Sequence, residues 1–307
     1  MIEAGYPIQD GALYADGFPV PDWTLGDHIM TMDTLGVNYS TISISAPGVF
    51  FIQDPSKAHA LARWINQEMH NYTAQYPHRL GALCLLPLPH VREALIELEH
   101  CLDTLKFVGV ATFTNSNGMY LGNASQDPIF EALNARKVPV FVHPAAPGCN
   151  GMSMGYPVPM TEYPFDTVRA VENLLLTGQR ASYPNISMIF AHGGGAIPYL
   201  ATRIAGMSSM PFLGGFNVTE SVKQLAGYYF DTASATSAIQ LAALRGFIGV
   251  GRILTGTDYP YVPTAQAQPA VESIQANGEF NSSEMAQINH RNALSIFPRV
   301  AEVLGVK

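Results

Sequence analysis

Three side chains that could bind a metal ion or move a proton, His143, His192 and Asp258, each follow a short apolar stretch of sequence. A neutral imidazole nitrogen and a carboxylate oxygen are the donors that zinc and similar divalent ions accept. The same groups act as general acids and bases near neutral pH. Together the three residues predict a site for one divalent metal ion, with Asp258 and His192 as the catalytic pair.

Each of these residues also has an ordinary structural explanation. A histidine beside a proline, as His143 is, more often makes a structural hydrogen bond, and Asp258 could cap a following helix. The run Gly193–Gly195 after His192 would allow close backbone approach to a ligand and a helix N-terminus aimed at an anion. Three such groups at equivalent places are improbable by chance, so we predict that they act together.

Two further polar residues are weaker candidates. Asp231 ends another apolar stretch, and we predict that it accepts a hydrogen bond that orients a catalytic imidazole. His90 follows Pro87-Leu-Pro89 after a strand-like segment. A contact with substrate is one explanation for His90, and capping of the next helix is the alternative.

The elements that must position these side chains alternate between strand and helix along the chain. Short, mostly apolar strands are predicted at 39–45, 80–86, 108–113, 138–142, 186–191, 228–231 and 252–255. Helical periodicity separates them, so each strand must be buried on both faces of a parallel sheet. We predict a single (β/α)8 TIM-barrel domain over residues 1–307, with an open doubly wound sheet as the alternative. The carboxyl ends of barrel strands share one mouth, where the candidate side chains would converge.

The strand count is one short of the eight that a closed barrel contains. The first 22 residues are rich in glycine and proline and do not have the pattern of a buried strand. The first strand of the barrel is therefore expected to be missing from this chain.

Composition excludes several classes of protein. Hydrophobic residues make up 48% of the 307 and charged residues only 13%, against a usual charged share of about 25%, which predicts a large core. The net charge is −8 and no Lys/Arg cluster is present, so nucleic-acid binding is not expected. No apolar run is long enough to span a membrane. Three scattered cysteines predict a reduced, cytoplasmic protein.

Three motifs carry a resemblance to a known family: Phe141-Val-His143-Pro144, Phe190-Ala-His192-Gly-Gly-Gly195 and Gly256-Thr-Asp258-Tyr-Pro260. In this order and spacing they resemble the amidohydrolase-related superfamily, and within it the aminocarboxymuconate-semialdehyde decarboxylase family. The resemblance covers the chain from about residue 20 to the C-terminal helices. Within the family, the sequence is most similar to the fungal 6-methylsalicylate decarboxylases.

This resemblance implies a metal-dependent, non-oxidative decarboxylase of a salicylate-type acid, which would convert 6-methylsalicylate to m-cresol and carbon dioxide in polyketide metabolism. It implies one divalent metal, zinc in the first place and manganese in the second, with His143 and Asp258 as ligands and His192 beside them. A small aromatic acid is the expected substrate, and a homodimer the expected assembly.

The family also carries a His-x-His or Glu-x-His metal-binding pair on its first barrel strand, and none of the seven predicted strands contains one. We expect the start of the barrel to lie in sequence upstream of Met1, which transcript mapping would reveal, or this form to be degenerate. The alternatives are therefore a metal-dependent hydrolase of a lactone or amide and a non-catalytic homologue. No lysine ends a strand, which favours the decarboxylase over a two-metal hydrolase.

Overall fold

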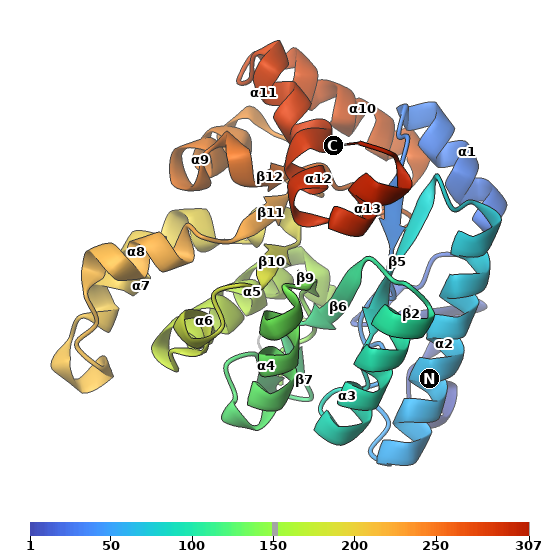
Figure 1. Cartoon of the computed structure of the whole chain (residues 1–307), viewed down its shortest axis with the longest axis horizontal. Helices are drawn as coiled ribbons and strands as arrows, with labels where there is room; N and C mark the ends of the chain where they lie inside the picture. Colours follow the sequence, from blue (N-terminus) through green and yellow to red (C-terminus); the bar gives the residue numbers. More distant parts are fainter. Residues whose placement is uncertain (149–152, 307) are drawn as a thin grey trace.

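The computed structural model describes residues 1–148 and 153–306, and its centre is a curled parallel sheet of seven strands (Figure 1). The strands occur in the order β12-β11-β10-β9-β6-β5-β4, so each lies beside the preceding one in the chain. Their bounds are β4 Ser40–Ile42, β5 Leu80–Leu85, β6 Gly109–Phe113, β9 Pro139–His143, β10 Ser187–Phe190, β11 Tyr229–Asp231 and β12 Ile253–Leu254. All seven strands predicted from the sequence are confirmed.

Helices cover the outside of the sheet, as the alternating pattern predicted (Figure 1). They are α1 Leu25–Leu35, α2 Pro55–Gln75, α3 Val91–Glu99, α4 Asp127–Arg136, α5 Val158–Leu176, α6 Gln179–Ser182, α7 Ile197–Ser208, α8 Val218–Leu225, α9 Ala238–Ile248, α10 Thr264–Ala276, α11 Ser282–Ala286, α12 Asn292–Ile296 and α13 Pro298–Val303. None of them, within the described ranges, is both long and apolar enough to cross a membrane.

The curl of the sheet brings its two edges near each other. Helix α1 precedes the edge strand β4 and α10 follows the edge strand β12, yet α1 and α10 are in contact, and the hydroxyls of Thr31 and Thr264 lie 2.6 Å apart. The C-terminal helices close the opposite end from the candidate residues, because Phe297 and Val300 pack on inward-facing strand residues such as Leu83. The fold is that of a TIM-barrel-like protein, with seven strands among the described residues.

Two small antiparallel units lie outside the main sheet. The first 22 residues, which lack the pattern of a buried strand, form the short strands β1 Ile8–Gln9, β2 Ala12–Ala15 and β3 Phe18–Pro19. A hairpin of β7 Asn115–Ser116 and β8 Met119–Tyr120 follows β6. Neither unit was predicted from the sequence.

The prediction that the cysteines are reduced is wrong for two of them. Cys84 of β5 and Cys101, just after α3, form a disulfide with Cα atoms 5.9 Å apart. The pair is 17 residues apart in sequence, and it meets because α3 folds back alongside the strand that precedes it. Cys149 lies outside the described residues.

A buried carboxyl group on α3 is hydrogen-bonded to side chains of α2. Glu97 is fully buried and accepts hydrogen bonds from Arg63 Nε at 2.7 Å and Asn66 Nδ2 at 2.8 Å, with His59 Nε2 at 3.1 Å. Asn66 also bonds both backbone groups of Leu85 in β5. The Glu97 carboxyl is therefore the centre of the contact between these helices and the sheet.

We expect Glu97→Ala to lower the free energy of unfolding by about 3 kcal/mol, because it leaves the buried Asn66 amide and the partly buried Arg63 guanidinium without this acceptor. Urea denaturation followed by circular dichroism measures this change. Asp103→Ala is the matched control: it breaks the exposed pair with Arg136 and should change stability by less than about 1 kcal/mol. Equal effects of the two substitutions would contradict the structural role of Glu97.

Candidate metal site

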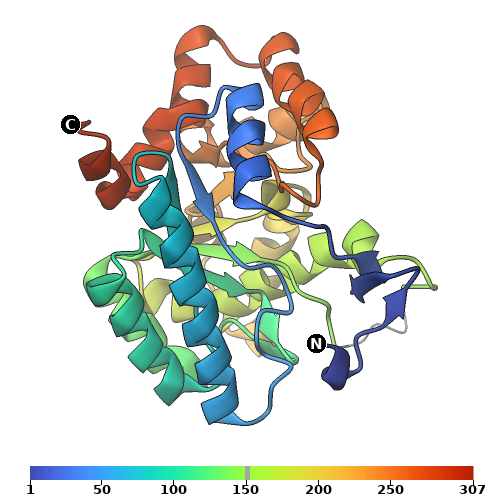
Figure 2. The same ribbon diagram turned by 90° about the vertical axis from the view of Figure 1, so that its right-hand side faces the viewer.

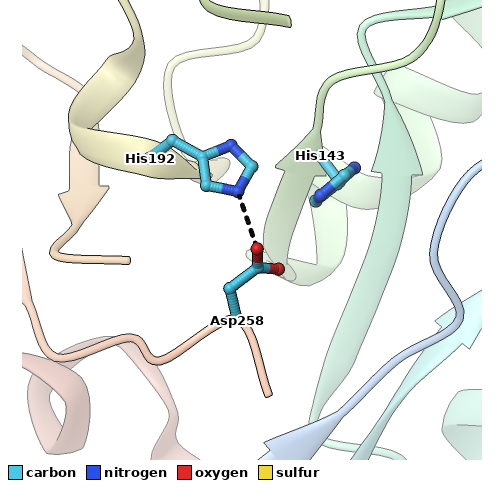
Figure 3. A group of neighbouring side chains, drawn as sticks. All are labelled: His143, His192 and Asp258. Atoms are coloured by element: carbon cyan, nitrogen blue, oxygen red, sulfur yellow. Dashed lines mark ion pairs between the residues drawn. The ribbon is translucent and has the colours of Figure 1, made fainter. Parts of the chain in front are cut away.

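The ends of three strands place His143, His192 and Asp258 around one point (Figure 3). His143 is the last residue of β9, His192 comes two residues after β10, and Asp258 follows β12. Strands β9 and β10 pair with Phe190 opposite Val142, so their carboxyl ends are level. The convergence predicted from the sequence is confirmed.

The distances among the three side chains are those of a small cluster. His192 Nε2 and Asp258 Oδ2 are 3.6 Å apart, and the ring centroids of His143 and His192 are 5.1 Å apart. One ligand atom from each residue lies within 4.8 Å of the other two. Within the described part of the chain, this is the one group of three or more His, Cys, Asp or Glu residues close enough to share an ion.

The hydrogen bond of His143 determines which of its nitrogens is free. Its Nδ1 lies 2.7 Å from the carbonyl oxygen of Pro144. A carbonyl only accepts, so Nδ1 carries the proton and Nε2 keeps its lone pair. Burial, together with the adjacent His192, lowers the pKa of His143 to about 4. His143 is therefore a neutral nitrogen donor at physiological pH.

His192 and Asp258 form an ion pair when no metal competes for them. Burial alone would lower the pKa of His192, but Asp258 outweighs it, and the pKa lies above its usual value. Burial alone would raise the pKa of Asp258, but His192 outweighs that effect and the pKa is lowered. Opposite charges are thus stabilised side by side at the cavity rim.

The backbone at both residues is unusual. His192 and Asp258 have φ angles of 58° and 60°, a left-handed conformation that is uncommon outside glycine and concentrates at functional sites. A Cβ on Gly256 would lie 2.8 Å from Cγ of Asp231. Only glycine fits there, two residues before Asp258.

The glycines after His192 serve packing within the protein. A Cβ on Gly193 would lie 2.8 Å from Cβ of Ala235, and one on Gly194 would lie 2.8 Å from the Phe230 ring. A Cβ on Gly195 would lie 2.4 Å from the Pro164 carbonyl oxygen. The close approach that the sequence suggested is therefore to neighbouring protein atoms, and it allows the chain to turn sharply at His192.

The Asp231 carboxylate contacts the main chain of His192, whereas the sequence predicted that it would contact the His192 imidazole. Its Oδ1 accepts hydrogen bonds from the main-chain N–H of His192 at 2.8 Å and of Ala233 at 3.1 Å. Burial raises the pKa of Asp231 to about 6. The carboxyl group holds the strained residue that carries the imidazole, and it lines the same cavity.

His90 is not part of the cavity lining, contrary to the suggested contact with substrate. It precedes the first residue of α3 but its side chain makes no capping bond. Instead its Nε2 lies 3.1 Å from the carbonyl oxygen of Ile52 and tethers that loop.

The cluster opens into a cavity of about 1140 Å³. Strand β4, the loop after it and strand β12 line the cavity, which extends to the C-terminal helices. Its walls are mostly apolar, with Ile44, Leu83, Phe141 and Leu254 among them, and Ser45 and Tyr261 contribute hydroxyls. A small aromatic ring has ample space beside the cluster.

Two residues near the cluster escaped the sequence analysis. Tyr163 of α5 packs edge-on against the His143 ring at 5.7 Å, and its hydroxyl donates to Asp16 Oδ2 at 2.6 Å. The dipeptide Asp16-Gly17 was a usable signal, because Asp-Gly is typical of a tight hairpin turn. Nothing in the sequence indicated that this turn reaches the site.

Metal affinity is expected to depend on pH through His192. Its raised pKa means that a divalent ion must displace a proton from Nε2, whereas the neutral His143 releases none. Below the His192 pKa the apparent affinity for Mn²⁺ should rise about tenfold per pH unit, and above it should level off. Calorimetric titration between pH 5.5 and 8, roughly the histidine range, measures this slope. A pH-independent affinity would contradict the assignment.

A family model described as Amidohydrolase matches residues 18–299 of the chain. The chain is 33% identical to the 6-methylsalicylic acid decarboxylase of Penicillium expansum, over 94% of this chain and 90% of that protein. It is 28% identical to the 2-amino-3-carboxymuconate-6-semialdehyde decarboxylase of Dictyostelium discoideum, over 78% of this chain and 67% of that protein. Both relatives are named as decarboxylases, the class of enzyme that the motifs implied.

A solved structure extends the similarity to three dimensions. The dihydroxybenzoic acid decarboxylase from Polaromonas, which holds manganese and the inhibitor 2-nitroresorcinol, superimposes with a TM-score of 0.81. The two are 25% identical, over 90% of this chain and 87% of that one. The chain therefore belongs to the amidohydrolase family, and within this family it is a decarboxylase, that is, a carboxy-lyase.

Proposed function

We propose that the protein is a metal-dependent, non-oxidative decarboxylase that converts 6-methylsalicylate to m-cresol and carbon dioxide. The observation that carries the proposal is the cluster of His143, His192 and Asp258, whose ligand atoms lie within 4.8 Å at the rim of a large apolar cavity. The 33% identity to a fungal enzyme of this name supports the choice of substrate.

The cluster has the chemistry of a divalent metal site. Two imidazole nitrogens and one carboxylate leave positions open for a substrate, as in other sites built from two histidines and a carboxylate. His143 offers a free Nε2 because its Nδ1–H is bonded to Pro144. His143, His192 and Asp258 would hold the ion, which would supply the Lewis acidity that withdraws electron density from the ring of a bound salicylate.

The residues of the chain would orient the ring and keep water from it. Apolar walls such as Ile44, Leu83 and Phe141 favour an uncharged aromatic ring over its ionised carboxylate, which promotes loss of that group. The Ser45 and Tyr261 hydroxyls, which also line the cavity, would hydrogen-bond to polar ring substituents. The ring carbon that bears the carboxylate would then face Asp258.

Asp258 would move the proton, with His192 beside it. The Asp258 carboxylate would first take the proton of the substrate's phenol group and then give it to the ring carbon that bears the carboxylate, which interrupts aromaticity. The carbon–carbon bond then breaks, carbon dioxide leaves, and the electron pair of that bond restores the aromatic ring. Asp258 ends the turnover as the carboxylate it began as, the phenolate of the product takes a proton from water, and His192, 3.6 Å away, holds the Asp258 carboxylate in position.

Incubation of the purified, metal-loaded protein with 6-methylsalicylate tests the proposal, with m-cresol measured by chromatography. We expect m-cresol and carbon dioxide in equal amounts. Metal-loaded protein that forms no m-cresol would refute this substrate. Activity on a lactone or amide alone would favour the hydrolase alternative, although no lysine that could bridge two metals is among the residues lining the cavity.

The identity of the metal is part of the proposal. The sequence predicted zinc first and manganese second, and the similar Polaromonas decarboxylase holds manganese. Nitrogen and oxygen donors in a two-to-one ratio suit both ions. Metal analysis of the purified protein, followed by reconstitution with Zn²⁺ or Mn²⁺, compares the two by the kcat that each supports.

We also propose that residues 1–307 act as one domain, as a homodimer in the cytoplasm, in a pathway of secondary metabolism. Exposed apolar side chains on and near α5 and α7 support self-association, with Met160 70%, Tyr199 88% and Phe212 79% exposed. The Cys84–Cys101 disulfide is compatible with the cytoplasm because both residues are fully buried, out of reach of thiol reductants. Light scattering and cell fractionation test the assembly and the location.

A further inference from the structure

The N-terminal strands form a small sheet with two Asp-Gly turns. Asp10-Gly11 joins β1 to β2 and Asp16-Gly17 joins β2 to β3, and all four residues have positive φ angles. This is the conformation of the tight hairpin turn that Asp-Gly favours. Figure 2 shows the sheet beside the segment that leads into α5, at one side of the barrel.

The second turn is bonded to the barrel by main chain and side chain. The Val158 N–H donates to the Asp16 carbonyl at 3.0 Å, and the Tyr163 hydroxyl donates to Asp16 Oδ2 at 2.6 Å. A Cβ on Gly17 would lie 3.3 Å from Cα of Pro157, so the turn and the start of α5 are in close contact. The turn is thus docked in one defined position.

The same sheet reaches both flanks of the metal cluster. On one flank the Tyr163 ring, which is 8% exposed, meets the His143 ring nearly at right angles. On the other flank Phe18 of β3 packs on Tyr261, with ring centroids 6.1 Å apart, and Tyr261 lines the cavity three residues after Asp258. The hairpin thus contacts two aromatic residues beside the cluster, Tyr163 next to His143 and Tyr261 close to Asp258.

We propose that the hydrogen bond between Asp16 and Tyr163 latches the N-terminal sheet over the metal site and thereby retains the aromatic substrate. The inference rests on the proposed decarboxylase function and assigns Asp16 and Tyr163 as positioning residues. Tyr163 has two separable roles: its ring packs on His143, and its hydroxyl holds the turn. Loss of the hydroxyl alone should therefore weaken substrate binding and leave the metal ligands in place.

The test compares Asp16→Ala and Tyr163→Phe with Asp16→Asn as the matched control. Asparagine still accepts a hydrogen bond and tolerates the φ of 54° at this position. We expect the KM for 6-methylsalicylate to rise about tenfold in Asp16→Ala and Tyr163→Phe, with kcat within about threefold and Asp16→Asn near wild type. The double variant Asp16→Ala/Tyr163→Phe should be no worse than Asp16→Ala alone.

Two measurements besides activity distinguish loss of the Asp16–Tyr163 hydrogen bond from a general destabilisation of the metal site. The affinity for Mn²⁺ should stay the same in Tyr163→Phe, and amide hydrogen exchange over residues 8–19 should quicken about tenfold in Asp16→Ala but not in Asp16→Asn. Exchange is measurable even if 6-methylsalicylate is not the substrate, so the latch and the proposed function fail independently. Additive effects in the double variant, a parallel fall in Mn²⁺ affinity, or unchanged exchange would each overturn the latch.

Discussion

Asp258→Asn is expected to lower kcat for 6-methylsalicylate about 1000-fold. The substitution keeps the size of the side chain but removes the charge that binds a divalent ion and the carboxyl that carries the proton. It also breaks the ion pair with His192, so the His192 pKa should fall from its raised value. Initial rates of m-cresol formation with saturating Mn²⁺ or Zn²⁺ measure the effect.

The control for this variant is the same chemical change away from the cavity. Asp103→Asn alters the exposed pair with Arg136 and should leave kcat within about twofold. A kcat for Asp258→Asn within tenfold of wild type would remove this carboxyl from the mechanism. Thermal denaturation of both variants excludes unfolding as the cause of a loss.

His192→Ala is expected to lower kcat by a similar factor, about 1000-fold, and to change how metal binding depends on pH. The imidazole is the group that must release a proton when the ion binds, because His143 is already neutral with a pKa of about 4. The tenfold rise in Mn²⁺ affinity per pH unit should therefore disappear in this variant, alongside a weaker affinity at every pH.

His78→Ala serves as the histidine control. Its side chain is exposed and contacts the Val303 carbonyl at the opposite end of the barrel, so both kcat and the pH slope should be those of wild type. If His192→Ala keeps the pH slope, the proton is released elsewhere. If it also keeps its turnover, His192 has no part in the reaction.

Much of the fold could be predicted because the strands are short, apolar and separated by helices with clear ends. Thr24 and Gly36 bound α1, and Asp54 caps α2 ahead of Pro55. These are local signals that the backbone obeys without long-range information. The carboxyl ends of parallel strands then bring His143, His192 and Asp258 together, whatever their separation in sequence.

The contacts that escaped prediction are those between distant parts of the chain. Asp16 meets Tyr163 across 147 residues, and no local pattern records that meeting. The role of Asp231 was predicted only as far as its place at a strand end, since whether a carboxyl contacts an imidazole or a main-chain N–H depends on backbone angles at His192. The pairing of Cys84 with Cys101 depends likewise on how α3 packs.

The central claim is that His143, His192 and Asp258 hold one divalent ion. Anomalous diffraction from crystals of the protein soaked in MnCl₂ tests it most directly, because the signal locates manganese without reference to activity. The account predicts one strong peak within bonding distance of an imidazole nitrogen of His143 and a carboxylate oxygen of Asp258, with His192 beside it. An empty cluster in crystals that bind manganese at another position would contradict it.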